Sequence, residues 1–144
     1  MPIRNLNKLF YPRSIAVIGA TSREHDAVDL VMHNLLQGGF EGPIMPVSTE
    51  QQAIAGVLAY PGIEALPMIP DLAVICAPPA VVPKAVRDLG NLGTRAAILM
   101  ATGVTRNGMS PAWHEAAAEA RPFGMRILGP ECVGVIVPHI GLNA

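Results

Sequence analysis

The chain has 144 residues, which fits one domain with a buried core. Hydrophobic residues make up 51% of it, which excludes a disordered polypeptide, and the formal net charge of −1 excludes the basic surface that nucleic acids or anionic membranes require. The opening residues MPIRNLNKLF lack the apolar run of a secretory signal, and no apolar run reaches the roughly 20 residues that span a bilayer. We therefore expect a cytoplasmic protein without nucleic-acid or membrane partners.

Five short apolar segments predict the strands of a sheet. They cover residues 14–19, 43–47, 72–77, 96–101 and 126–129. Within them apolar and polar residues do not alternate, which is typical of strands buried on both faces. The sequence therefore favours a parallel sheet that is covered by helices on each side.

Three segments between these strands carry apolar residues at helical spacing. Their predicted buried faces contain Val28, Val31, Met32, Leu35 and Leu36 in the first helix, Val82, Ala85, Val86 and Leu89 in the second, and Trp113, Ala116, Ala117 and Ala120 in the third. Gly38-Gly39 should end the first helix and Gly90 and Gly93 the second, while Ser110 should cap the third, with Pro111 at its first position. The resulting order β-α-β-β-α-β-α-β predicts an α/β fold: a Rossmann-like, doubly wound, mostly parallel sheet with helices on both faces.

The loop after the first strand is the first candidate binding element, because such sheets bind ligands at the carboxyl ends of their strands. Gly19 allows a tight turn, and the backbone amides of Thr21, Ser22 and Arg23 could meet an anion at the start of the next helix. Arg23 adds a guanidinium suited to phosphate. A plain turn between strand and helix is the alternative, since one glycine after a strand is weak evidence.

The sequence departs from the pattern of a site for the nicotinamide dinucleotide NAD. Its fingerprint needs two further glycines after Gly19 and a carboxylate at the end of the second strand, where this chain has Ser48 and Thr49. These departures count against NAD without excluding it.

Other strand ends and titratable residues give less specific signals. Pro78-Pro79 forms a rigid apolar ledge on which an adenine or a pantetheine arm could lie, or it is a stiff connector. Cys132 lacks a neighbouring base, so we expect a packed, reduced thiol. The four histidines have neither metal-ligand spacing nor a triad context, and we expect no catalytic constellation in this chain and no metal site.

Several longer segments resemble the CoA-binding domain of the NDP-forming acyl-CoA synthetases, which include the succinyl-CoA synthetase α subunit. The resemblance covers nearly the whole chain and rests on LFYPRSIAVIGAT (9–21), NLLQGGFEGPIMPVS (34–48), VLAYPGIEALPMIPDLAVICAPPAVVP (57–83) and GMRILGPECVGVIVPHIGLNA (124–144). The chain looks closest to the N-terminal domain of bacterial GNAT-type protein lysine acetyltransferases, in which a synthetase-like region precedes the catalytic domain.

The resemblance implies a site for CoA or acetyl-CoA, with residues assigned by motif position. The nucleotide phosphates would meet Gly19, Ala20, Thr21, Ser22 and Arg23; the adenine and ribose would lie beside Val47, Ser48, Ala77, Pro78 and Pro79; the pantetheine would approach Thr102, Gly103 and Glu131. The phosphorylated histidine of the synthetases belongs to their next domain, so no histidine here inherits that role.

The chain departs from the synthetase pattern at three places that add negative charge. Asp26 or Asp29 replaces a glycine, Glu50 stands where a lysine is usual, and Glu131 replaces an asparagine. A like charge ~4 Å from a ligand phosphate would cost about 4 kcal/mol at an effective dielectric of ~20, before screening. The added charges favour a domain that senses CoA or acetyl-CoA over one that takes part in the synthetase reaction.

We therefore expect residues 1–144 to be a single CoA-binding domain, the N-terminal fragment of a larger protein. Its expected role is to bind CoA or acetyl-CoA and regulate a protein lysine acetyltransferase, with the other domains of that protein as partners. One alternative is the CoA-binding part of an ADP-forming acyl-CoA synthetase. The other is a degenerate scaffold that no longer binds ligand and serves contacts in a homo-oligomer.

Overall fold

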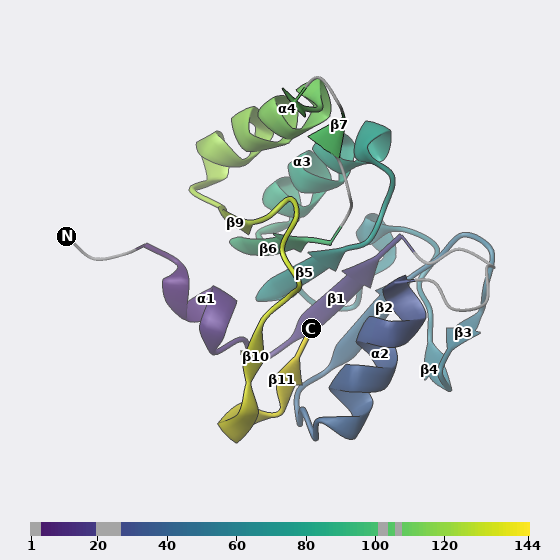
Figure 1. Cartoon of the computed structure of the whole chain (residues 1–144). Coiled ribbons are helices and arrows are strands. Elements are labelled where there is room, and N and C mark those ends of the chain that lie inside the picture. Colours follow the sequence, from purple (N-terminus) through teal and green to yellow (C-terminus); the bar gives the residue numbers. More distant parts are fainter. Residues whose placement is uncertain (1–3, 20–26, 101–103, 106–107) are drawn as a thin grey trace.

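A five-stranded parallel sheet forms the centre of the molecule (Figure 1). A computed structural model describes residues 4–19, 27–100, 104–105 and 108–144. In the sheet, β2 (Ile44–Val47), β1 (Ile15–Ile18), β5 (Leu72–Ile75), β6 (Ala96–Leu99) and β9 (Arg126–Leu128) lie side by side in that order. All five predicted strands are confirmed, each ending within two residues of its predicted bounds.

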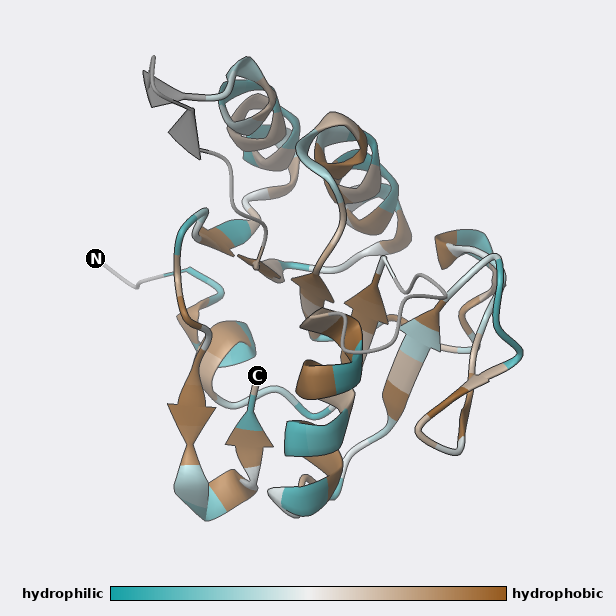
Figure 2. Ribbon diagram, turned by 45° about the vertical axis from the view of Figure 1, so that its right-hand side comes forward, coloured by the Kyte–Doolittle hydropathy of each residue, from teal (hydrophilic) through white to brown (hydrophobic). Residues whose placement is uncertain are grey.

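Helices and loops cover both faces of the sheet, as the apolar strand sequences predicted. On one face, α3 (Val82–Leu92) packs against α4 (Pro111–Ala120); on the other lie α2 (Ala27–Gln37) and α1 (Leu6–Phe10) (Figure 1). Successive strand residues face opposite layers, so Ile75 belongs to the core beneath α3 and Val74 to the core beneath α2. Figure 2 shows the central strands as mostly hydrophobic ribbon between these layers.

The strand order creates a switch point at the carboxyl end of β1. The chain leaves β1 for β2 on one side and then returns across β1 to pair β5 on its other side. Connections therefore diverge from β1 toward opposite faces, and a crevice opens where they part. Because ligands of such sheets bind in this crevice, the carboxyl ends of β1, β2 and β5 are the candidate binding site.

Short elements outside the main sheet were not predicted. They include α1 and three antiparallel hairpins formed by β3 (Ala53–Ile54) with β4 (Val57–Leu58), β7 (Val104–Thr105) with β8 (Gly108–Met109), and β10 (Ile136–Val137) with β11 (Leu142–Asn143). Two-residue strands are too short to show an apolar period.

No helix in the described ranges has the length and apolarity to cross a bilayer.

Three details of the predicted helices were wrong. Leu36 is 43% exposed and Ala117 is exposed, so each lies outside the buried face of its helix. Gly90 does not end α3; it lies within the helix, where its missing side chain makes room for the ring of Phe123. Ser110 is the N-cap of α4 and precedes Pro111, both as predicted, although its side chain makes no capping hydrogen bond.

Asp71 links the start of β5 to the segment that precedes β1. Its carboxylate accepts a hydrogen bond from Lys8 Nζ at 2.7 Å and one from the Arg13 backbone N–H at 3.1 Å. Burial alone would raise the pKa of Asp71, but these hydrogen bonds and the charges of Lys8 and Arg13 together lower the pKa below its ordinary value of 3.8.

The free energy of unfolding should therefore depend on pH through Asp71. A depressed pKa in the folded state means that the contribution is present above pH 3.8 and is lost as pH falls through the lower, folded value. We expect Asp71→Asn to cost about 1 kcal/mol at neutral pH and to flatten the acid limb of a plot of melting temperature against pH. Lys8→Met should flatten the same limb in part; an acid limb unchanged in both variants would contradict this account.

Candidate functional site

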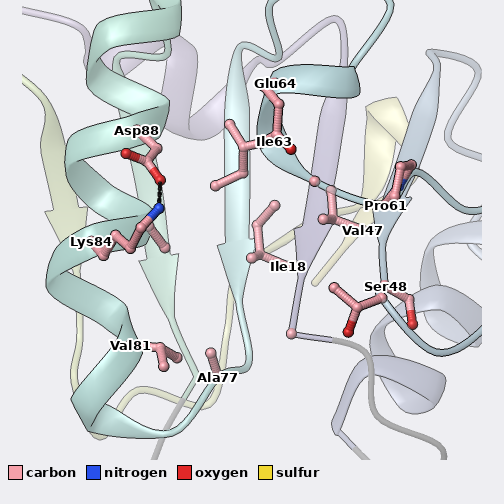
Figure 3. A pocket seen from close by; sticks show the side chains of 14 residues that line it. Ile18, Val47, Ser48, Pro61, Ile63, Glu64, Ala77, Val81, Lys84 and Asp88 are labelled. Carbon is pink, nitrogen blue, oxygen red and sulfur yellow. Dashed lines mark hydrogen bonds and ion pairs between the residues drawn. The ribbon is translucent and has the colours of Figure 1, made fainter.

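A pocket of about 370 Å³ lies at the carboxyl ends of β1, β2 and β5 (Figure 3). The segment around the 3-10 helix η1 (Ile63–Ala65) and the first half of α3 form its other walls. It is lined by Ile18, Gly19, Val47, Ser48, Thr49, Pro61, Gly62, Ile63, Glu64, Ala77, Val81, Lys84, Ala85 and Asp88. The lining is mainly apolar with a few polar groups, which is typical of small-molecule sites.

Gly19 lets the chain turn at the end of β1 while it passes close to the end of β5. Its φ of +101° is rarely adopted by residues with a side chain. A Cβ there would lie 2.9 Å from the backbone nitrogen of Ala77 and 3.0 Å from its Cα. The Cys76 N–H donates to the Ile18 carbonyl at 2.9 Å and holds the two strand ends together, so this position requires glycine.

Ser48 shapes the wall that follows β2. Its buried hydroxyl accepts hydrogen bonds from the backbone N–H groups of Glu50 and Gln51, at 3.2 and 3.1 Å, which turns the chain away from the sheet. The Ser48 N–H donates to the Tyr60 carbonyl at 2.9 Å, and the Tyr60 N–H donates to the Pro46 carbonyl. These bonds return the chain to β2 and position the η1 segment over the pocket.

Charged side chains stand on the walls away from β2. Lys84 and Asp88 project from α3 and form an ion pair, with Lys84 Nζ 2.5 Å from Asp88 Oδ2, and Glu64 projects from η1 (Figure 3). The floor between them is apolar, with Ile18 and Ile63 pointing into the space (Figure 3). The pocket thus combines an apolar surface with one cation and two carboxylates from the described residues.

The structure brings together four of the residues that the resemblance assigned to the site. Gly19, Val47, Ser48 and Ala77 line the pocket. Pro78 and Pro79 follow Ala77 directly and lead into the 3-10 helix η2 (Pro79–Val81), but they do not line this pocket. Glu131 is exposed and lies beyond β9, at the edge of the sheet opposite β2. Ala20, Thr21, Ser22, Arg23, Thr102 and Gly103 lie outside the described residues, and their roles stay predictions.

Sequence reasoning missed the pocket walls formed by η1 and α3. Ile63 and Glu64 reach the site through the fold of the β2–β5 connection, for which the sequence holds no periodic signal. Lys84 and Asp88 lie in the first turns of the helix that follows the third predicted strand, and this position is the one signal that pointed to them, because their polarity alone did not. Glu50, predicted to repel the ligand, is exposed and is not part of the lining.

None of the cysteine and histidine side chains that the structure describes lines this pocket. Cys132 is half-buried, packs against the core beneath α2 and donates its S–H to the Leu99 carbonyl at 3.5 Å, in agreement with a packed thiol. His33 and His114 are exposed, and the ring of His139 lies 5.5 Å from that of Tyr11. His25 is outside the described residues.

The chain is similar in sequence to curated proteins and in fold to solved structures. The chain is 33% identical over 141 residues to the acetate–CoA ligase (ADP-forming) I of Archaeoglobus fulgidus, covering 96% of this chain and 20% of the relative. It is 34% identical over 143 residues to the α subunit of acetate–CoA ligase (ADP-forming) II of Pyrococcus furiosus, covering 96% of this chain and 31% of that subunit. The chain thus spans a fifth to a third of the length of these relatives.

A solved structure shares the fold closely, and the sequence matches a defined domain family. The dinucleotide-forming acetyl-coenzyme A synthetase 1 of Ca. Korarchaeum cryptofilum, in complex with phosphate and ADP, superposes with a TM-score of 0.89 at 32% identity, covering 96% of this chain and 30% of that one. Residues 13–138 match the family described as CoA binding domain. The chain therefore belongs to the CoA-binding domain family.

Proposed function

We propose that this chain is the CoA-binding part of an ADP-forming acyl-CoA synthetase. The observation that carries the proposal is the switch-point pocket: Gly19, Val47, Ser48 and Ala77 line it in a chain that belongs to the CoA-binding domain family. The relatives reported above are named as CoA ligases or synthetases, and none as an acetyltransferase. They support the synthetase alternative of the sequence analysis better than a regulatory domain of a lysine acetyltransferase.

In this proposal the chain binds and orients CoA, and its partner domains perform the acyl transfer. Gly19 lines the pocket at the end of β1, and the diphosphate would bind at the start of the segment that follows it, where a strand leads into a helix. The adenine would lie on the apolar surface between Val47, Ile63 and Ala77, because the face of a flat aromatic ring buries apolar area against such side chains.

The size of the pocket agrees with a nucleotide as its occupant. A volume of about 370 Å³ lies at the lower end of the range of small-molecule sites. The pocket would hold the adenosine end of CoA, and the pantetheine arm would run outward along the strand ends. Such an arrangement leaves the thiol available to a second domain.

Calorimetric titration of the chain with CoA, acetyl-CoA and NAD tests the proposal. We expect saturable binding of CoA and acetyl-CoA, with dissociation constants in the micromolar range (about −8 kcal/mol), and no comparable binding of NAD. Binding of NAD alone would contradict the ligand assignment. In a longer protein that contains this chain, formation of ADP from ATP that requires both CoA and a carboxylic acid would support a synthetase, and acetylation of protein lysines without it would support the acetyltransferase.

A further inference from the structure

Lys84 is, among the described residues, the one cation that lines the pocket. It projects from α3, on the wall across the pocket from Ser48 (Figure 3). The wall at the end of β2 offers the hydroxyls of Ser48 and Thr49, and the remaining charged groups of the described lining are Glu64 and Asp88. An anionic group that enters beside α3 therefore has Lys84 as its partner.

The ion pair that engages Lys84 in the free protein is weak enough to be exchanged. The side chains of Lys84 and Asp88 are 76% and 35% exposed, so water screens their attraction. Lysine also precedes aspartate in this i,i+4 pair, the order that gains less from the helix dipole. A phosphate dianion offers Lys84 more charge than the single carboxylate of Asp88 does.

We infer that Lys84 binds the 3′-phosphate of CoA and exchanges Asp88 for it when the ligand enters. The inference rests on the proposed function, which assigns the diphosphate to the loop after Gly19. The 3′-phosphate on the ribose is then the one anionic group of CoA without an assigned partner. Lys84, on the α3 wall of the pocket, is placed to bind it. Among the described residues, Lys84 is then the one that distinguishes CoA from ligands without a 3′-phosphate.

Asp88 has the opposite effect in this arrangement. Its carboxylate lines the same wall, competes for the ammonium of Lys84 and repels an incoming phosphate. Neutralising Asp88 should therefore strengthen the binding of CoA, while neutralising Lys84 should weaken it. Two changes four residues apart on one helix thus have opposite expected signs, which a general loss of structure would not produce.

Titrations of CoA and of dephospho-CoA into matched variants test the inference. For Lys84→Gln we expect about tenfold weaker binding of CoA and less than about a twofold change for dephospho-CoA. For Asp88→Asn we expect about threefold tighter binding of CoA. Arg87→Gln is the control, because Arg87 lies on the same helix but pairs with Glu119 of α4 at 2.9 Å and does not line the pocket; its affinity for CoA should match that of the wild type.

The possible results separate this inference from the proposed function. If the wild-type chain binds neither CoA nor acetyl-CoA, both fail. If the wild type binds CoA but Lys84→Gln binds it equally well, or loses the same factor for CoA and dephospho-CoA, the assignment of Lys84 to the 3′-phosphate is wrong and the proposed function stands. Melting temperatures of all variants identify any that is unfolded, and the opposite shift in Asp88→Asn keeps the inference testable if Lys84→Gln is one of them.

Discussion

Replacing Gly19 by alanine should weaken CoA binding by about ten- to a hundredfold. A residue with a side chain at this φ carries about 1–3 kcal/mol of backbone strain, and each 1.4 kcal/mol relieved by moving the loop away from its binding position costs a factor of about ten. The new Cβ would also lie 2.9 Å from the backbone nitrogen of Ala77, which cannot rotate aside as a side chain would. Titration calorimetry with CoA measures the loss, and urea unfolding measures the accompanying destabilisation.

Gly56→Ala is the matched control for this change. Gly56 also has a positive φ, of +80°, but a Cβ there would meet nothing within 4 Å, and the residue does not line the pocket. We expect it to lose about 1 kcal/mol of stability from backbone strain and to keep the wild-type affinity for CoA. A folded Gly19→Ala variant that binds CoA as tightly as the wild type would place the ligand elsewhere on the molecule.

The main sheet was predictable because its strands are buried on both faces. The segment LAVI of β5 is apolar throughout, and each of its residues is fully buried. Such a run has no polar position that could be mistaken for a turn or a solvent-facing helix. The strand pair β3 and β4 is held by only two residues on each side, so its pairing depends on the turn and leaves no pattern in the sequence.

The candidate site was predictable only where it depends on the sheet. Parallel strands bring their carboxyl ends to one edge, and this alone groups Gly19, Val47 and Ala77. The η1 wall depends instead on the bridge between Val47 and Tyr60, a contact that forms only after the β2–β5 connection has folded back. Lys84 lies off the apolar stripe of its helix, and a sequence does not distinguish a polar residue that faces a pocket from one that faces bulk water.

In the α2 helix, too, the sequence did not show which side chains at the edge of the apolar stripe are buried. The spacing placed Leu35 and Leu36 on one apolar stripe, but Leu35 is fully buried and Leu36 is 43% exposed. Adjacent helical residues differ by about 100° in direction, so the edge of a stripe is the position that spacing determines least well. The layer beneath the helix, which includes Leu142 of β11, decides which side chain is covered.

Alanine substitution of these two neighbours should therefore have very different effects on stability. We expect Leu35→Ala to lower the free energy of unfolding by about 2–5 kcal/mol, the cost of removing a fully buried leucine and leaving a cavity. Leu36→Ala should cost less than about 1 kcal/mol, because much of that side chain is already in contact with water. Both changes gain the same helix propensity, so the difference between them reports burial alone.

Urea unfolding followed by the fluorescence of Trp113 measures both variants. Trp113 is the single tryptophan, is 3% exposed and lies on α4, on the opposite side of the sheet from α2, so its signal follows the loss of the whole fold. Equal losses for Leu35→Ala and Leu36→Ala would contradict the exposure of Leu36. They would also indicate that another surface covers this part of α2 in solution, where Leu30 is likewise 62% exposed.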